Sequence, residues 1–292
     1  MIVCLYHNDL DGKCAGHLVY DFVDISTEEG LKMIPVNYNS VIPYDVLDEN
    51  DTLYIVDFSI PPSTMEQLLE NNVNIIWIDH HISAIEKYKD FPYDIRGIRY
   101  NGWAGCELTW AYLNGHPINE DVRGIIPNYI RLIGDYDTWQ FRFEEDTVSL
   151  CSGIDSYNNN PDDYIWQNLK TIDGFFAVLE RGGAIEEFKK KQRKEIVKEY
   201  AFISEFEGYK VAFCNANRQN SKLFDSFKGK YDFVSVFSYL PEGKWTFSIY
   251  QANDNSPDLS RIADKYGGGG HKGAAGFTVD TWRIENGKMM IE

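Results

Sequence analysis

Carboxylate and imidazole side chains stand directly after three short apolar runs of this sequence. The residues concerned are His7, Asp9 and Asp11 after the first of these runs, Asp57 after the second, and Asp79, His80 and His81 after the third. One aspartate in such a place is most simply a turn or a helix cap. Three apolar runs that all end this way favour a shared site instead. A further acidic pair, Asp135 and Asp137, follows a helical pattern.

The residue types in this cluster predict metal chemistry. Carboxylates a few ångströms apart repel one another and raise each other's pKa, and divalent cations remove this conflict. Ligands that are mostly carboxylate oxygen with some histidine nitrogen, and no cysteine, favour manganese or magnesium over zinc. The cluster holds more ligands than one ion needs. It therefore predicts two ions about 3.5–4 Å apart, which activate a water molecule and neutralise a phosphate during hydrolysis.

A second concentration of chemistry-bearing residues lies near the C-terminus, where four consecutive glycines, 267–270, precede His271 and Lys272. Glycines let the backbone approach a ligand closely and turn amide groups toward an anion. A flexible turn is the simpler interpretation of such a run. The Gly/Ala-rich segment 273–276 has the composition of a helix start, which favours phosphate binding.

The elements that must position the first cluster alternate strands with helices. The apolar pattern predicts strands over 2–6, 32–38, 52–58 and 74–78, with helices over 12–24 and 62–71. This alternation predicts βαβ units and a parallel sheet covered on both faces. Ligands of such sheets gather at the carboxyl ends of the strands. If the strands before Asp57 and Asp79 neighbour the first strand, the acidic groups converge there.

The rest of the chain predicts more helices and then a second domain. The predicted elements are helices over 104–113, from Asn160-Pro161 onward and over 184–205, strands over 210–214, 233–239 and 244–251, and a hairpin at Asn286-Gly287. We therefore expect an α/β protein with a parallel, doubly wound N-terminal domain (1–183), a linker helix (184–207) and a smaller mixed α/β C-terminal domain (208–292).

Composition limits the classes of partner. The 292 residues carry a net charge of −17, so long duplex nucleic acid is a poor partner. Five cysteines without a CxxC pair indicate buried free thiols in a reducing compartment. The apolar runs are too short for a membrane span, and the first residues show no cleavable signal, so we expect a cytoplasmic protein.

The order and spacing of these motifs resemble those of the DHH phosphoesterases, a family named for the triplet seen here as Asp79-His80-His81. Members carry His and Asp residues after strand one, an Asp after a later strand and a further Asp beyond the triplet. Those with the DHH-associated C-terminal domain end in a GGGH loop, seen here at 268–271. The resemblance covers nearly the whole chain, and residues 6–12 are most similar to the oligoribonuclease (nanoRNase) type of member.

Carried over to this chain, the resemblance implies two manganese ions, with magnesium or cobalt as weaker substitutes. The implied ligands are His7 and Asp9 for one ion, Asp11, His80 and Asp135 for the other, and Asp57 as the bridge. Asp137 occupies a motif position without an implied role, and a helix cap explains it equally well.

The resemblance also implies residues that act on the substrate. His81 would face the scissile phosphate, making it a catalytic residue together with Asp57, and Asp79 would orient an imidazole from outside the ligand set. The implied substrate-binding residues are Gly268, Gly269, Gly270, His271 and Lys272. Many relatives place an arginine where Tyr250 stands here, so that phosphate contact is either missing or supplied by Arg218, Arg261 or Lys272. Trp103 and Trp139 are candidates for stacking on a base.

These residues together predict a metal-dependent phosphoesterase that hydrolyses phosphodiester or phosphomonoester bonds of short oligonucleotides or nucleotides, as an exonuclease-type oligoribonuclease. A cyclic-dinucleotide phosphodiesterase and a 3′-phosphoadenosine 5′-phosphate phosphatase stay open as alternatives. A nucleotide-sensing module is the alternative outside enzymes, although a sensor would be expected to lose metal ligands. The sequence predicts no oligomeric state.

Overall fold

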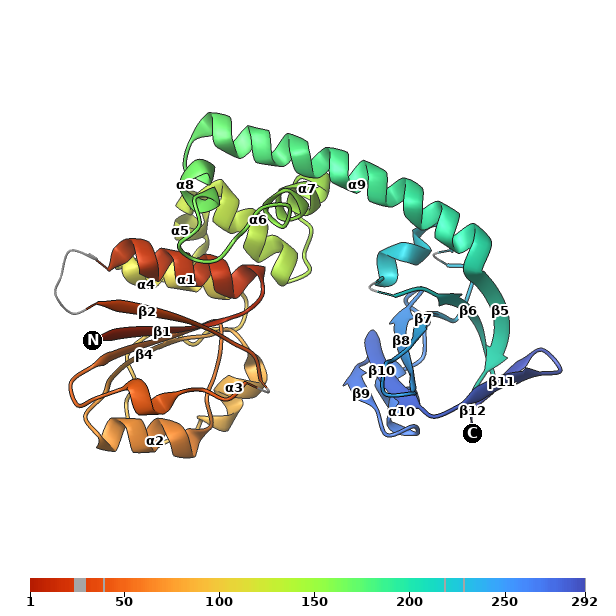
Figure 1. Cartoon of the computed structure of the whole chain (residues 1–292), viewed down its shortest axis with the longest axis horizontal. Helices are drawn as coiled ribbons and strands as arrows, with labels where there is room; N and C mark the ends of the chain where they lie inside the picture. Colours follow the sequence, from red (N-terminus) through yellow and green to blue (C-terminus); the bar gives the residue numbers. More distant parts are fainter. Residues whose placement is uncertain (24–29, 39, 218, 228, 292) are drawn as a thin grey trace. The chain divides into compact units, whose positions relative to one another are not determined.

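The computed structural model describes residues 1–23, 30–38, 40–217, 219–227 and 229–291. The chain divides into two compact units, Met1–Glu186 and Glu187–Glu292 (Figure 1). The division falls within a long helix, α9 (Ile172–Tyr200), whereas the sequence predicted residue 183 as the last of the first domain. Each unit is described by itself.

The first unit is built on a parallel sheet of four strands. These are β1 (Ile2–His7), β2 (Leu31–Val36), β3 (Thr52–Val56) and β4 (Asn74–Ile78), in the order β2-β1-β3-β4. Every pairing in it is parallel. The predicted parallel sheet is therefore confirmed, and β1, β3 and β4 are neighbours, as convergence of the acidic motifs requires.

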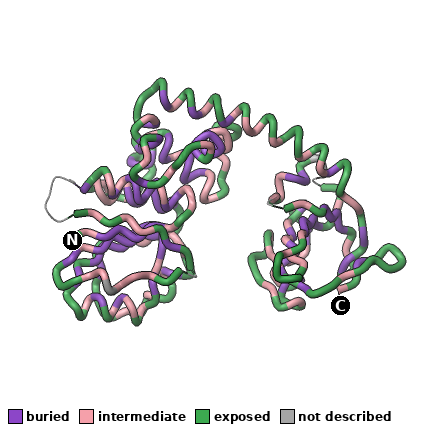
Figure 2. The backbone as a smooth tube through the Cα atoms, in the orientation of Figure 1, coloured by how far each residue is buried: buried purple, intermediate pink, exposed green. Residues whose placement is uncertain are grey.

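Alternation along β1 explains why the sheet is covered on both faces. Cys4 and Tyr6 face one hydrophobic core, and Val3 and Leu5 face the other. The first core is closed by α1 (Leu10–Phe22), α4 (Gly105–Leu113) and α6 (Asn128–Asp137), and the second by α2 (Pro62–Glu70) and α3 (Ile82–Lys87). Figure 2 shows the buried strands between these two layers.

The remaining elements of this unit are a 3-10 turn (Tyr44–Val46), α5 (Glu120–Ile125), α7 (Glu144–Ile154) and α8 (Ile165–Leu169). The helix predicted from Asn160-Pro161 is wrong, because α8 begins only at Ile165. Side chains of the core bind the two carbonyl groups instead: Trp166 Nε1 donates to Asn160 O and His17 Nδ1 lies 2.8 Å from Pro161 O.

The helix predicted over 184–205 begins earlier and ends sooner. Helix α9 ends at Tyr200, and Ala201–Phe206 forms strand β5, which pairs antiparallel with β6 (Tyr209–Asn215). Ser204 and Phe206 alternate into the core of the second unit. Strand pairing therefore overrides the local helical pattern at these residues.

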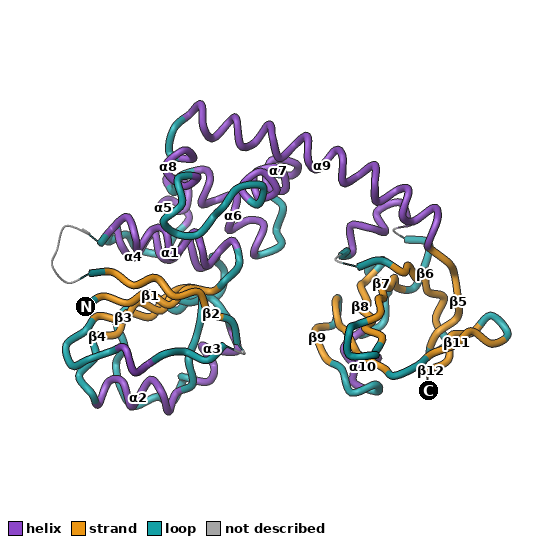
Figure 3. Tube along the Cα trace, in the orientation of Figure 1, coloured by secondary structure: helices purple, strands orange, loops and turns teal. Residues whose placement is uncertain are grey.

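The second unit contains one mixed sheet of eight strands, drawn in orange in Figure 3. Besides β5 and β6 it includes β7 (Phe233–Tyr239), β8 (Trp245–Gln251), β9 (Gly269–His271), β10 (Ala274–Val279), β11 (Trp282–Glu285) and β12 (Lys288–Ile291), in the order β11-β12-β5-β6-β7-β8-β10-β9. A 3-10 segment (Ser221–Phe227) and helix α10 (Leu259–Asp264) complete it.

Two further expectations are confirmed in the described part of the chain. The predicted hairpin joins β11 and β12, where Asn286 (φ 52°) and Gly287 (φ 77°) both adopt the left-handed conformation of a type I′ turn. All five cysteines are buried and free. Among the described helices, none is both long and apolar enough to span a membrane.

Candidate metal centre

The acidic motifs meet at the carboxyl edge of the first sheet. His7 is the last residue of β1, Asp57 follows β3, and Asp79 and His80 follow β4. Because these strands are neighbours and parallel, their ends lie side by side. The sequence predicted this convergence correctly.

Two separate groups of side chains converge there and approach one another. His7, Asp9 and Asp57 form one group, and Asp11, His80 and Asp137 form the other, with the potential ligand atoms of each group within 4.8 Å of one another. A third group, Asp57, His80 and His81, meets the same criterion and shares residues with both. The nitrogen–oxygen distances are 2.7 Å for His7–Asp9, 3.6 Å for His7–Asp57, 3.1 Å for His80–Asp57, 3.4 Å for His80–Asp137 and 3.9 Å for His80–Asp11. Asp57 thus offers one oxygen to each group.

The geometry does not support Asp135 as a ligand. Its carboxylate is buried and accepts hydrogen bonds from Arg142 Nε (3.0 Å), from Thr147 Oγ1 (2.6 Å) and from the amides of Arg142 and Phe143. Asp137, at the end of α6, points to His80 instead. The geometry therefore favours Asp137, which had received no role, as the residue of this motif that joins the cluster.

Backbone groups hold the carboxylates in place. The amides of Gly105 and Cys106, at the start of α4, donate to the two oxygens of Asp11 at 2.7 and 2.9 Å. A Cβ atom on Gly105 would lie 2.6 Å from Asp57 Cβ, so only glycine allows α4 to approach this closely. Asp57 itself has φ 53°, a left-handed conformation that concentrates at functional sites.

A buried ion pair fixes the start of α4. Glu107 accepts two hydrogen bonds from Arg123, at 3.0 and 2.9 Å, and one from the amide of Ala104. Both side chains are buried. This pair therefore stabilises the helix turn whose amides bind Asp11.

Asp79 orients His81. Its Oδ1 lies 2.7 Å from His81 Nδ1 and accepts hydrogen bonds from the amides of His80 and His81. The Asp79 side chain is fully buried, whereas 31% of the His81 side chain is exposed. His81 Nδ1 is 3.9 Å from Asp57 Oδ1, so the exposed ring lies at the border of the cluster.

Crowding shifts the pKa values of the carboxyl groups. Burial, followed by the charge of Asp57, raises the pKa of Asp11 to about 8. Burial and the charge of Asp11 raise the pKa of Asp137 to about 7, and burial also raises the pKa of Asp57. Contacts with Asp57 and Asp9 raise the pKa of His7 to about 10.

Several buried polar atoms of the cluster lack a hydrogen-bond partner among the described residues. They are His7 Nδ1, both carboxylate oxygens of Asp57 and His80 Nε2. Leaving such atoms unpaired costs free energy, and a mixed carboxylate and imidazole set is a donor set that divalent cations prefer. The residues present therefore fit a divalent metal site.

Comparison with known proteins agrees with this geometry. Residues 1–133 match the DHH family, N-terminal domain. The chain is similar to oligoribonuclease NrnB of Bacillus subtilis (strain 168), with 24% identity across 94% of this chain and 71% of that protein.

Two further comparisons extend this result. An uncharacterized protein of Acanthamoeba polyphaga mimivirus is 24% identical across 78% of this chain, which spans only 53% of that relative. A solved DHH domain from a member of the s1p family of ribosomal proteins has a TM-score of 0.60 at 17% identity, covering 94% of this chain and 82% of that one. Because the two sequences are only 17% identical, this similarity shows that the two proteins share a fold and nothing more.

The GGGH segment of the second unit differs from its prediction. The helix start expected at 273–276 is wrong, because Ala274–Val279 is strand β10, with Phe277 and Val279 alternating into the core. Strand β9 (Gly269–His271) is exposed and pairs with β10 at the edge of the sheet. The amides of Gly267 and Gly268 donate to carbonyls of α10, so they do not face an anion.

The other residues predicted to contact the substrate differ in how exposed they are. His271 and Lys272 are exposed, whereas Arg261 lies 3.5 Å from Asp258. Arg218 is outside the described residues. Trp103 is 2% exposed and cannot stack on a base, while Trp139 is 52% exposed and packs beside Phe141.

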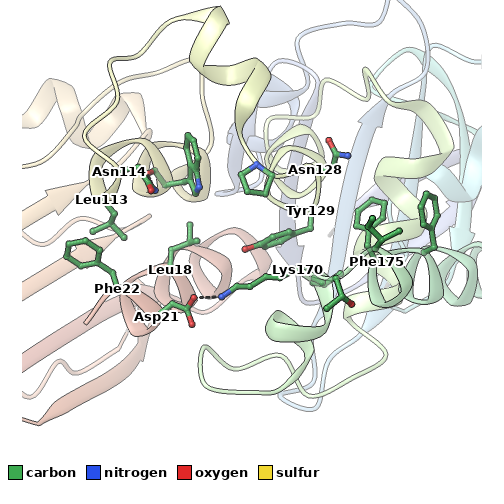
Figure 4. Close-up of a pocket in the computed structure, with 15 residues that line it drawn as sticks. Leu18, Asp21, Phe22, Leu113, Asn114, Asn128, Tyr129, Lys170 and Phe175 are labelled. Atoms are coloured by element: carbon green, nitrogen blue, oxygen red, sulfur yellow. Dashed lines mark hydrogen bonds and ion pairs between the residues drawn. The ribbon is translucent and has the colours of Figure 1, made fainter. Parts of the chain in front are cut away.

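A cavity of about 540 Å³ in the first unit is separate from the candidate metal centre. Figure 4 shows Leu18 and Phe22 of α1, Leu113 of α4 and Tyr129 of α6 around it, beside an ion pair between Asp21 and Lys170. The cluster residues of these same helices are at their opposite ends. The cavity therefore contributes no side chain to the candidate metal centre.

Proposed function

We propose that this DHH domain binds two divalent metal ions, with manganese preferred, and hydrolyses phosphate ester bonds of short oligonucleotides or nucleotides. The observation that carries the proposal is the convergence of two ligand groups whose nearest members, Asp57 and His80, are 3.1 Å apart. Similarity to an oligoribonuclease across 94% of this chain supports the nucleotide substrate.

The structure supports a specific assignment of ligands. His7, Asp9 and Asp57 are the proposed ligands of one ion, and Asp11, His80 and Asp137 of the other. Asp57 is the proposed shared ligand, because its two oxygens face His7 and His80 respectively. When bound, two such ions activate a water molecule and neutralise the charge of the phosphate.

His81 is proposed to act on the substrate rather than on a metal. The contact between Asp79 and His81 Nδ1 fixes the ring and leaves Nε2 as the atom that reaches a phosphate oxygen or the leaving group. The amides of Gly105 and Cys106 keep Asp11 in place throughout, because they belong to a helix start.

Substrate selection rests on charge. A chain with a net charge of −17 offers little attraction for a long polyanion, which favours short substrates. Residues 268–272 stay proposed substrate-binding residues of the second unit, where His271 and Lys272 are exposed.

One panel tests the proposal. The purified chain with manganese is given di- to pentaribonucleotides, a cyclic dinucleotide, 3′-phosphoadenosine 5′-phosphate and pyrophosphate, each with and without excess chelator. We expect the fastest turnover on the linear ribonucleotides and none in chelator. The matched control is the variant Asp57→Asn. This substitution removes the negative charge of the proposed shared ligand and leaves the volume of the side chain almost unchanged.

The other outcomes are equally informative. Preference for the cyclic dinucleotide or for the bisphosphate would replace the proposed substrate with one of those. Binding of nucleotides without any turnover would indicate a sensing module. Full turnover in chelator would overturn the metal mechanism.

A further inference from the structure

An exposed aromatic ring lies beside the candidate metal centre. Tyr38 follows β2 and is 61% exposed, yet its ring contacts residues of this edge of the sheet. Its centroid is 5.8 Å from that of His7, 6.2 Å from that of His81 and 5.1 Å from that of the buried Phe58. Most of the Tyr38 side chain is therefore open to solvent beside residues of the candidate metal centre.

Backbone contacts position this ring. Strand β2 pairs with β1 along its length, and the amide of Asn8 donates to Val36 O at 3.0 Å. A turn follows in which the Asn37 amide donates to Ser40 Oγ and the Ser40 amide donates to Asn37 O, both at 2.8 Å. Tyr38 is thus attached to the strand end that neighbours His7.

Tyr38 differs from the carboxylate and imidazole side chains around it because it is an uncharged aromatic ring. A phenol is uncharged at neutral pH, so this ring adds no charge beside the carboxylates of the candidate metal centre. A neutral, partly exposed ring beside a phosphate-cleaving cluster offers an apolar face. Nucleobases stack on such rings regardless of sequence, and loss of one ring lowers affinity about 5- to 150-fold.

We propose that Tyr38 stacks on the nucleobase attached to the phosphate held at the candidate metal centre, so that this site selects phosphate esters that carry a base. The inference rests on the proposed function for the position of the phosphate. It adds a substrate-binding residue that the sequence motifs did not indicate.

Equilibrium binding separates this inference from turnover. The probes are adenosine 5′-phosphorothioate and the base-free ribose 5-phosphorothioate, both in manganese, with wild type, Tyr38→Phe and Tyr38→Leu. We expect wild type and Tyr38→Phe to prefer the nucleotide, and Tyr38→Leu to lose that preference by about tenfold. Affinity for the base-free probe and for manganese should not change. Tyr164→Leu, at another exposed tyrosine (79%), is the matched control.

The result also separates the two proposals. If wild type hydrolyses short ribonucleotides but Tyr38→Leu keeps its preference for the nucleotide probe, the role of Tyr38 is overturned and the proposed function stands. If no ester is hydrolysed but Tyr38→Leu loses that preference, the enzyme function fails and base stacking stands. Equal loss of affinity for both probes in Tyr38→Leu would also overturn stacking, because it would indicate a distorted site.

Discussion

Asp135 and Asp137 lie two residues apart on helix α6 but have different partners. Asp135 is fully buried and accepts hydrogen bonds from Arg142 and Thr147, whereas the Asp137 carboxylate lies 3.4 Å from His80 Nε2. Residues two positions apart on a helix face opposite directions. One aspartate therefore stabilises the fold, and the other is available to a metal ion.

Exchange of each aspartate for asparagine should separate these roles. Asp137→Asn should lower manganese affinity and reduce turnover about 10²-fold without changing the free energy of unfolding much. Asp135→Asn should instead destabilise the unit by about 2 kcal/mol, because it weakens charge-assisted hydrogen bonds. Calorimetric manganese titration and denaturant unfolding of both variants test this. Loss of manganese binding in a stably folded Asp135→Asn variant would reverse the assignment.

The second prediction concerns metal content. Wild type should bind two manganese ions per chain, and chelator should abolish turnover. Asp57→Ala should lower affinity for both ions, because its two oxygens face both ligand groups, whereas Asp9→Ala should mainly affect one. Metal analysis after dialysis measures this difference. A stoichiometry of one in the wild type would contradict the shared ligand.

The third prediction concerns His81. Its ring is held by Asp79 and partly exposed, so His81→Ala should reduce turnover about 10²-fold or more while manganese content stays normal. Asp79→Asn should have a smaller effect, since the ring remains present but less well oriented. Loss of manganese from His81→Ala would make His81 a ligand, which its place beside Asp57 and His80 would allow.

Much of the fold and the convergence of the acidic motifs followed from the sequence. Apolar runs of strand length, each ending in acidic or imidazole groups, were enough to predict the parallel sheet and the convergence of Asp11, Asp57 and His80. The choice between Asp135 and Asp137 was not predictable, because it depends on Arg142 and Thr147, which reach Asp135 only in the folded chain.

Contacts that form only in the folded chain also explain the errors in the predicted secondary structure. Segments 201–206 and 274–279 have helical or glycine-rich patterns, but pairing with β6 and β8 makes both of them strands. Tyr38 was missed for a similar reason. A tyrosine two residues beyond a strand carries no signal until β2 is placed beside β1.

The fourth prediction concerns pH and stability away from the metal centre. Burial lowers the pKa of His17 from 6.5 to about 4, and its Nε2 is buried without a hydrogen-bond partner among the described residues. Below pH 6.5 the unfolded chain takes up a proton that the folded chain does not. The free energy of unfolding should therefore fall by about 3 kcal/mol between pH 6.5 and 4 because of this group.

His17→Asn removes this proton and keeps a donor for Pro161 O. The variant should be less stable at pH 8, where a well-packed ring has been lost, but its stability should decline less steeply as the pH falls. Urea unfolding at several pH values compares the two slopes. Identical slopes would show that His17 is already accessible to protons in the folded state.

The last prediction concerns substrate length. The net charge of −17 means that each added phosphate brings repulsion from the protein as a whole, while the cluster at the edge of the first sheet can act on only one ester at a time. Catalytic efficiency should therefore peak at about two to five nucleotides and decline in longer strands, most steeply at low salt, where repulsion is least screened. A series from dimer to about 25-mer at two salt concentrations, with manganese fixed, measures this dependence. Efficiency that rises steadily with length, or cleavage of a circular strand, would falsify the preference for short substrates.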